Sequence, residues 1–177
     1  MPILAKSEIL REIAAGRIKI TPYDARMVGP ASVDLHLSDA FRVFVHLPTT
    51  LDVTEGLDFR SATKGFRVPA GECLELQPGQ TVLGITQEKV ELPPDICGWL
   101  EGRSRYARVG LLVHVSSSFM QPGIANHQVL EMSNFGPIAL RIRPGTAVCQ
   151  FIFQRAEGNG RYEGVFRGQD PEDFFND

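Results

Sequence analysis

The spacing of hydrophobic residues changes after the first short segment of the chain. Near the N-terminus they recur at intervals of three and four, the period of a helix that buries one face, at Ile9, Leu10, Ile13 and Ala14. Ser7 is a residue type favoured just before a helix, Glu8 suits a first turn, and Gly16 can end a helix in the left-handed conformation. The pattern therefore predicts a short helix that starts after Ser7 and ends near Gly16.

Beyond this segment, hydrophobic and polar residues alternate, as they do in half-buried strands. The alternation is clearest over residues 33–37, 41–47, 138–142 and 149–153. In the second of these segments, Phe41 and Val43 are expected on the buried face and Arg42 on the polar one. Turn-forming Gly and Pro residues separate the segments at positions 69–71, 78–79, 93–95, 122–123, 136–137 and 144–145. Many short strands with such turns predict a mainly β fold, either a sandwich or a barrel-like sheet.

Size and charge restrict the classes of protein that fit. The 177 residues, 43% of them hydrophobic, suffice for one globular domain with its own core. The net charge is −3, and four acidic residues lie within the last eight, at Asp170, Glu172, Asp173 and Asp177. No basic excess marks a nucleic-acid-binding surface, and no hydrophobic run approaches the roughly 20 residues of a membrane span. We therefore expect a cytoplasmic protein without a secretory signal and with neither nucleic acid nor membrane as a partner.

Several familiar chemical motifs are missing from the sequence. It has no GxxxxGK[ST] phosphate loop, no GxGxxG after a strand, no CxxC, and no HxE followed by the PCxxC that zinc-dependent nucleotide deaminases require. Cys73, Cys97 and Cys149 are odd in number and widely spaced, which predicts reduced, buried thiols. Four histidines remain: His36 and His46 are expected to be structural or solvent-facing, whereas His114 and His127 are better candidates because they flank a polar segment.

Residues 101–134 hold most of the side chains that could bind a ligand or take part in catalysis. Arg103, Arg105 and Arg108 fall within six residues, with Ser104 among them. A guanidinium group suits forked recognition of phosphate oxygens, although a solvated basic turn fits the same residues. Farther along, Glu131 interrupts a hydrophobic strand pattern. Such an acid often faces solvent; if buried, its pKa would be raised and it could act as a general base or acid.

Residues 102–111 resemble the GRSSLARLGL signature of the dCTP deaminase family, within the trimeric dUTPase superfamily. Residues 30–35 resemble the family's early PxSxDL element, and further matches in the family's order lie at residues 86–93, 122–134 and 144–151. The resemblance implies a distorted β-barrel of the dUTPase-like (β-clip) type with a short N-terminal helix. It covers residues 1–155 as a single domain and leaves residues 156–177 as a tail that is either mobile or ordered over the active site.

The reaction implied by the resemblance is deamination of dCTP to dUTP and ammonia without zinc. Glu131 matches the general base, which takes a proton from water and delivers it toward the pyrimidine and the leaving ammonia. Ser104 would contact phosphate or order the attacking water. Arg108 would support the catalytic base and the charge that develops near it, and Arg103 would bind the triphosphate. The residues expected to contact the pyrimidine edge through their backbones are Val129 and Leu130.

The resemblance also implies partners. Family members are homotrimers with active sites between subunits, and Mg²⁺ accompanies the nucleotide, held mainly by its phosphates rather than by protein ligands. The expected ligands are dCTP and dUTP, with dTTP as a candidate inhibitor.

The sequence departs from the family pattern at several positions. Gln121 stands where Asp is common; its amide could bond a 3′-hydroxyl but cannot act as a base, which argues against further hydrolysis of dUTP. Arg105 replaces a serine and either adds charge near the phosphates or points to solvent. In the tail, residues 166–169 resemble a Tyr-x-Gly-Gln closing element that includes Gln169, and Val165 stands in place of a lysine. Tyr162 is similar to an upstream tail tyrosine of the family, at a shorter spacing. Two alternatives therefore remain: a bifunctional enzyme that continues to dUMP, and a nucleotide-binding homologue without catalysis.

Overall fold

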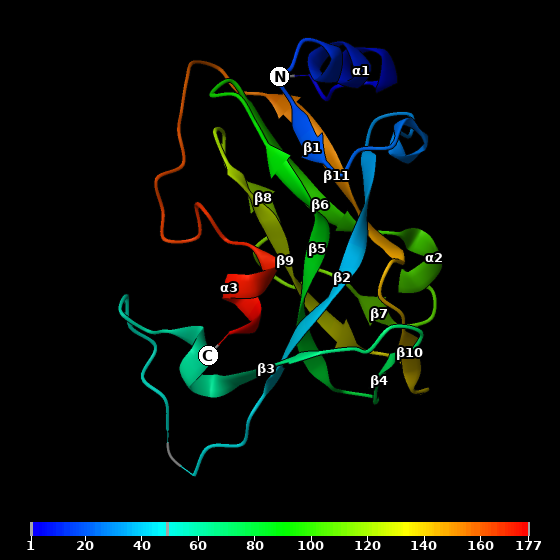
Figure 1. The fold of residues 1–177 in the computed structure, drawn as a ribbon, viewed down its shortest axis with the longest axis vertical. Helices are drawn as coiled ribbons and strands as arrows, with labels where there is room; N and C mark the ends of the chain where they lie inside the picture. Colours follow the sequence, from blue (N-terminus) through cyan, green and yellow to red (C-terminus); the bar gives the residue numbers. More distant parts are fainter. Residues whose placement is uncertain (1, 49, 177) are drawn as a thin grey trace.

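The chain folds into short helices and antiparallel strands over residues 2–48 and 50–176, which the computed structural model describes. In chain order these are α1 (Lys6–Ala14), β1 (Lys19–Thr21), η1 (Ala25–Met27), β2 (Val33–Phe44), η2 (Phe59–Ala62), β3 (Thr63–Arg67), β4 (Leu74–Leu76), β5 (Thr81–Glu91), β6 (Ile96–Gly102), α2 (Ser104–Ala107), β7 (Leu111–Leu112), β8 (Phe119–Met120), β9 (Ala125–Asn134), β10 (Leu140–Ile142), β11 (Ala147–Arg155) and α3 (Pro171–Phe175). The prediction of a mainly β fold with a short N-terminal helix is confirmed (Figure 1).

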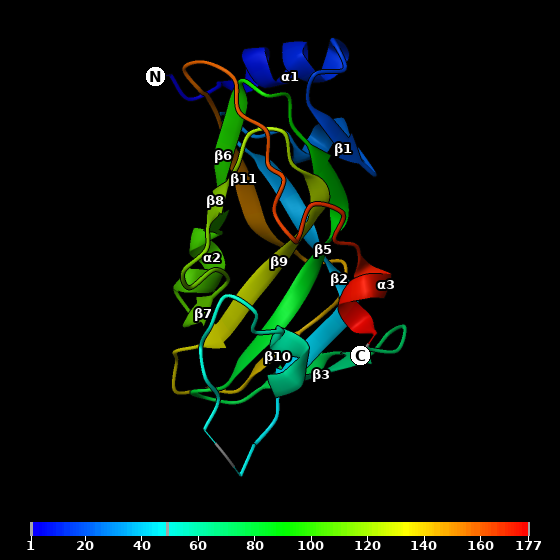
Figure 2. The same cartoon turned by 90° about the vertical axis from the view of Figure 1, so that its left-hand side faces the viewer.

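One curled sheet contains most of the strands, in the order β7-β9-β5-β2-β11-β6-β8, with β1 beside β5 and β3 beside β2. A separate pair joins β10 to β4. The curl brings the two ends of the sheet together, because a Cβ atom at Gly102 of β6 would lie 3.7 Å from Val113, which directly follows β7. The sheet is therefore a partly closed, barrel-like structure with the core inside the curl (Figures 1 and 2).

The predicted strand over residues 149–153 is part of β11. Cys149, Phe151 and Phe153 are at most 1% exposed, and the two aromatic rings stack with centroids 4.6 Å apart. Alternation thus correctly assigned the buried face of this strand. All three cysteines are free thiols; Cys97 and Cys149 are buried and Cys73 is partly so. Burial raises the pKa of the Cys149 thiol, which keeps it protonated.

Helix α1 begins two residues earlier than Ser7 would place it as a cap. The residue before the helix is Ala5, which has no side chain to cap it. Instead, the Lys6 N–H donates to the Pro30 carbonyl at 2.7 Å, so a tertiary contact satisfies an amide that a capping side chain would otherwise serve. The predicted end of the helix is confirmed: Gly16 follows it with a φ of +68°, in the left-handed region that favours glycine.

The expected alternation fails in the second half of β2. Arg42, placed on the polar face by the sequence pattern, is 0% exposed, whereas Val43 is 37% exposed. The pairing of β2 with β5 shifts register between Leu37 and Phe41, and such an irregularity changes which side chains face the core. Strand pairing therefore overrode the simple two-residue period at this position.

The C-terminal segment packs beside β2, and Arg42 fixes it there. The Arg42 guanidinium donates to the carbonyls of Phe174, Phe175 and Asn176 at 2.8, 3.2 and 3.2 Å, and to the Thr63 hydroxyl at 2.8 Å. These carbonyls end α3, where a helix leaves acceptors unpaired and favours positive charge. A buried cation thus holds the last helix against the sheet.

No helix among the described residues is long and apolar enough to cross a membrane.

Candidate functional site

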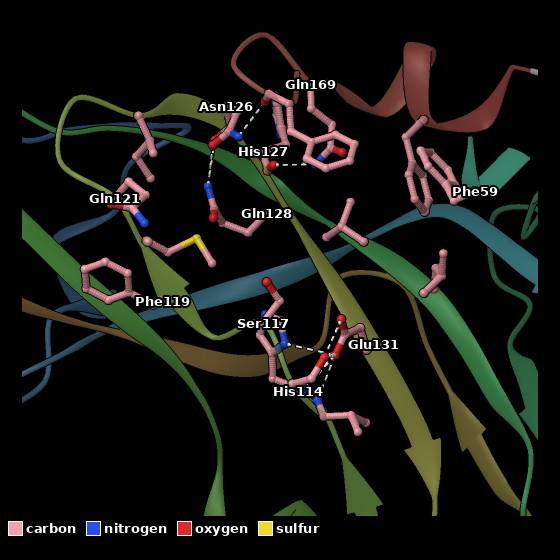
Figure 3. A pocket seen from close by; sticks show the side chains of 18 of the residues that line it. Phe59, His114, Ser117, Phe119, Gln121, Asn126, His127, Gln128, Glu131 and Gln169 are labelled. Atoms are coloured by element: carbon pink, nitrogen blue, oxygen red, sulfur yellow. Dashed lines mark hydrogen bonds and ion pairs between the residues drawn. The ribbon is translucent and has the colours of Figure 1, made fainter. Parts of the chain in front are cut away.

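A cleft of about 760 Å³ opens between the sheet and the C-terminal tail (Figure 3). Strands β5 and β9 supply one wall, and the segment from residue 114 to residue 121 borders it. Aromatic rings from β2, η2, β8 and the C-terminal tail line it, namely Phe44, Phe59, Phe119, Tyr162, Phe166 and Phe174. An apolar cleft with a few polar groups is the usual form of a small-molecule site.

Strand β9 aims Glu131 into this cleft. Side chains on the strand alternate between buried and half-buried, so Val129, Glu131 and Ser133 share the face that lines the cleft. Leu130 is 0% exposed and packs its side chain into the core on the other face. Val129 and Leu130 were both predicted to contact the pyrimidine edge through their backbones. The side chain of Val129 lines the cleft, whereas that of Leu130 does not.

The Glu131 carboxylate is held by donors from the segment that follows β7. Its Oε2 accepts the Ser116 N–H at 2.7 Å and the Val115 N–H at 3.2 Å, and the Ser116 hydroxyl lies 3.1 Å from Oε2 and 3.2 Å from Oε1. Oε2 therefore receives both backbone donors, while Oε1 contacts only the hydroxyl.

This setting lowers the pKa of Glu131 rather than raising it. Partial burial raises the pKa, but the Ser116 donors, His114 and the Val115 N–H together outweigh burial and bring it below the usual glutamate value. The condition under which the sequence predicts a raised pKa, full burial, is not met, because the side chain is 27% exposed and meets donors to its charged form. Glu131 is thus ionised at neutral pH.

His114 lies beside this carboxylate. Its side chain is 6% exposed, and Nδ1 is 3.7 Å from Glu131 Oε2, too far for a hydrogen bond. Among the described residues, neither ring nitrogen has a hydrogen-bond partner. Burial lowers the pKa of His114 despite the opposing effect of Glu131 and Glu101. The sequence singled out His114 only by its position near the polar segment and gave no sign of its contact with Glu131.

The predicted arginine cluster does not line the cleft within one chain. Helix α2 carries Ser104 and Arg105, with Arg103 just before it and Arg108 just after. None of the four lines the cleft, and in both views α2 and α3 stand on opposite sides of the molecule (Figures 1 and 2). Ser104, Arg105 and Arg108 are exposed.

Arg103 differs from the other members of this cluster. Its Nη1 lies 3.2 Å from an Asp34 carboxylate oxygen and donates to the Ala147 carbonyl at 3.2 Å. Arg103 is therefore partly neutralised and held, while Arg105 and Arg108 present their charges at the surface.

The tail contributes directly to the cleft. Tyr162 and Gln169 line it together with Gln121, as the predicted binding set requires of these three. The His127 N–H donates to the Gln169 carbonyl at 3.0 Å, and the Gln169 amide returns a bond to the His127 carbonyl at 3.2 Å. The Asn126 amide donates to the Phe166 carbonyl at 2.8 Å. The tail thus runs along β9 of its own chain.

The cleft-lining residues include a single carboxylate, that of Glu131, and neither lysine nor arginine, within the part of the chain that the structure describes. Over those same residues, no group of three or more His, Cys, Asp or Glu side chains is placed to hold a metal ion.

Sequence reasoning missed the aromatic lining and the holding of Glu131 by Ser116. Phe44 and Phe59 come from segments far from β9 in sequence, and no local pattern links them to the site. The contact of Ser116 with Glu131 depends on a chain reversal that the sequence does not reveal.

Comparisons with known proteins identify the family. A family model described as "dCTP deaminase-like" matches residues 3–156. The "dCTP deaminase, dUMP-forming" of Clavibacter michiganensis is 36% identical over 94% of this chain and 86% of its own length. The "dCTP deaminase" of Thermomicrobium roseum is 37% identical over 86% of this chain and 79% of its own length.

A solved structure supports the fold alone. The 2′-deoxycytidine 5′-triphosphate deaminase from Agrobacterium tumefaciens superposes with a TM-score of 0.67 at 20% identity. The match covers 88% of this chain, which spans about half of that longer one, 48%. The family match over residues 3–156 and the curated relatives establish that this chain belongs to the dCTP deaminase-like family.

Proposed function

We propose that this protein deaminates dCTP, converting dCTP and water to dUTP and ammonia. One observation carries the proposal: an ionised carboxylate, Glu131, is held by three donors on the wall of a cleft large enough for a nucleotide. Family membership and relatives named dCTP deaminase support the substrate. Water is a poor nucleophile, and a positioned base provides the deprotonation that attack on a pyrimidine carbon needs.

In this proposal, Oε1 of Glu131 is the oxygen that takes the proton. Because Oε2 already accepts two backbone N–H groups, Oε1 is the more basic oxygen and the freer one. Glu131 takes one proton from the attacking water and delivers it to the ring nitrogen N3 as the C4–O bond forms. It then moves the second water proton to the amino group, which leaves as ammonia when the C4–N bond breaks. The carboxylate is regenerated, so atoms and charge balance without zinc.

The cleft walls suit a deoxynucleoside. Val129 and the aromatic rings give an apolar surface for the flat pyrimidine, while the Gln121 amide can donate to a sugar hydroxyl. Tyr162 and Gln169 place polar groups on the tail side. We propose that the tail, which packs along β9, covers the bound nucleotide, with Arg161 or Arg167 supplying charge in place of the lysine absent at Val165.

The triphosphate needs cations that this cleft lacks. A polyanion bound beside Glu131 without compensating charge would be repelled. We therefore propose that the active protein is a homotrimer in which Arg103, Ser104, Arg105 and Arg108 of one subunit reach the cleft of the next. Exposure of Arg105 and Arg108 supports this proposal, as does their absence from the lining of the cleft in their own chain. Mg²⁺ would enter with the nucleotide, bound by phosphate oxygens and water.

The product distinguishes this proposal from its runner-up. Several relatives are named dUMP-forming, which favours a bifunctional enzyme that also releases pyrophosphate. Against this, Gln121 lies in the cleft where the family commonly has Asp, and Glu131 is the single carboxylate in the described lining. Hydrolysis at phosphorus needs its own water-positioning base, so we propose dUTP as the final product. The third alternative, a non-catalytic nucleotide binder, gives no role to the held base.

Separate incubations with dCTP, CTP and dUTP test the proposal. They contain excess Mg²⁺ and a zinc-selective chelator, and products are identified by chromatography together with an ammonia assay. We expect dUTP and ammonia in equal amounts from dCTP and no consumption of dUTP. Formation of dUMP would establish the bifunctional alternative, and tight dCTP binding without conversion would establish the non-catalytic one.

A further inference from the structure

His114 occupies an unusual position between two cavities. It lines the main cleft and also a smaller hollow of about 240 Å³ that reaches between β6 and β7. Its side chain is 6% exposed, yet both ring nitrogens lack hydrogen-bond partners among the described residues. Buried polar groups are normally paired, so an unpaired one calls for an explanation.

Two carboxylates face the ring. Glu131 of β9 lies 3.7 Å from Nδ1, and Glu101 of β6 acts on the ring from the side of the hollow. Both favour the charged imidazolium, but burial opposes it more strongly and holds the pKa of His114 below its usual value. The ring is therefore neutral at pH 7, with one N–H to donate.

We propose that His114 is a positioning residue for Glu131, which it serves by directing a neutral Nδ1–H toward Oε2. This inference rests on the proposed role of Glu131 in deamination. It adds a third N–H to the two backbone donors already on Oε2 and so leaves Oε1 as the proton-accepting oxygen. The distance of 3.7 Å shortens to hydrogen-bond length when the nucleotide closes the cleft.

The His114 N–H also favours the later step in which Glu131 passes its proton to the substrate. Each hydrogen bond to the charged carboxylate makes its protonated form a stronger acid. Glu131 therefore gives up the water-derived proton to the substrate more readily while His114 faces it. No proton is gained or lost by His114 in the cycle, so the balance of the deamination is unchanged.

Charging His114 would disturb this arrangement. As the pH falls through the pKa of His114, an imidazolium forms beside Glu131 and binds the carboxylate as an ion pair. The ion pair makes Glu131 a weaker base. Activity should therefore fall as His114 becomes protonated, which adds His114 to the groups that set the acid limb of the activity profile.

Two variants separate positioning from packing. His114→Asn keeps an N–H donor near the place of Nδ1 but cannot be charged, whereas His114→Leu fills the space without a donor. We expect His114→Leu to lower kcat by roughly tenfold or more and His114→Asn to recover most of that loss. The acid limb should move to lower pH in His114→Asn. His46→Asn, at an exposed position, is the matched control and should leave the profile in place.

A superimposable pH profile for His114→Asn and the wild type would overturn the proposal, as would equal kcat losses in the Asn and Leu variants. Thermal unfolding of each variant checks that the fold is retained.

A measurement without turnover keeps this inference separate from the proposed function. NMR titration of the His114 ring in nucleotide-free protein should give a lower pKa in Glu131→Gln than in the wild type, since the facing negative charge is gone. An unchanged titration overturns the pairing. If instead the titration shifts but the wild type does not convert dCTP, the pairing stands and the proposed function fails.

Discussion

Glu131→Gln is expected to lower dCTP deamination by roughly a thousandfold, with dCTP still bound. The glutamine amide has nearly the shape of the carboxylate and can accept the Ser116 N–H that Glu131 accepts at 2.7 Å, so the segment after β7 should stay in place. The amide cannot take a proton from water, and general base catalysis contributes factors of about 10²–10⁴. Steady-state kinetics give the loss in kcat, and calorimetry with dCTP gives binding.

Glu91→Gln provides a matched control for this experiment. Glu91 ends β5, the strand paired with β9, but does not line the cleft. Its ion pairs with Lys19 and Lys89 are long, at 3.8 and 3.5 Å, and exposed, so little change in activity or stability is expected. A Glu131→Gln protein as active as Glu91→Gln would remove Glu131 from the mechanism.

Arg42→Met is expected to lower the free energy of unfolding by roughly 3 kcal/mol and to loosen the tail. Methionine matches the length of the aliphatic part, but it leaves the carbonyls of Phe174 and Phe175 without a buried donor that reaches them at 2.8 and 3.2 Å. Removing one partner from a buried charged interaction is costly because the other is left desolvated. Phe174 lines the cleft, so KM for dCTP should rise as well. Urea unfolding and kinetics measure the two effects.

Arg60→Met is the control for Arg42→Met. Arg60 donates to the carbonyls of Asp173 and Asn176 at 3.0 and 3.3 Å, so it binds the same segment, but its side chain is 36% exposed. Water can replace its contacts, and a much smaller loss is expected. Equal losses in the two variants would contradict the assignment of stability to the buried cation.

The strand pattern predicted much of the fold because alternation reflects a local geometric rule. It located β11 and the face of Phe151 and Phe153. It placed Arg42 on the wrong face, since burial there depends on a register shift and on carbonyls more than 130 residues away in sequence. The sequence also predicted Ser7 as the cap of α1. That prediction was wrong because the Pro30 carbonyl, which accepts the first amide of the helix, is a tertiary partner that the local sequence does not reveal.

The candidate site was predictable as a set of residues but not as an arrangement. The order and spacing of the family motifs identified Glu131, Gln121, Tyr162 and Gln169 as site residues, and all four line one cleft. The lowered pKa of Glu131 could not be predicted, because it depends on hydrogen bonds from Ser116 and Val115. The local sequence does not show that these residues lie beside Glu131. Motif order also could not show that α2 lies outside this cleft, a separation that only the folded chain reveals.

We propose that each active site combines Glu131 of one subunit with the arginines of another. Mixing two inactive variants, Glu131→Gln and Arg108→Ala, tests it most directly. In mixed trimers formed from equal amounts, about one quarter of the sites contain an intact Glu131 facing an intact Arg108, because each contribution is chosen independently. The account predicts recovery of about one quarter of wild-type dCTP deamination. A mixture that remains as inactive as its parents, with mixed trimers verified by mass spectrometry, would contradict it.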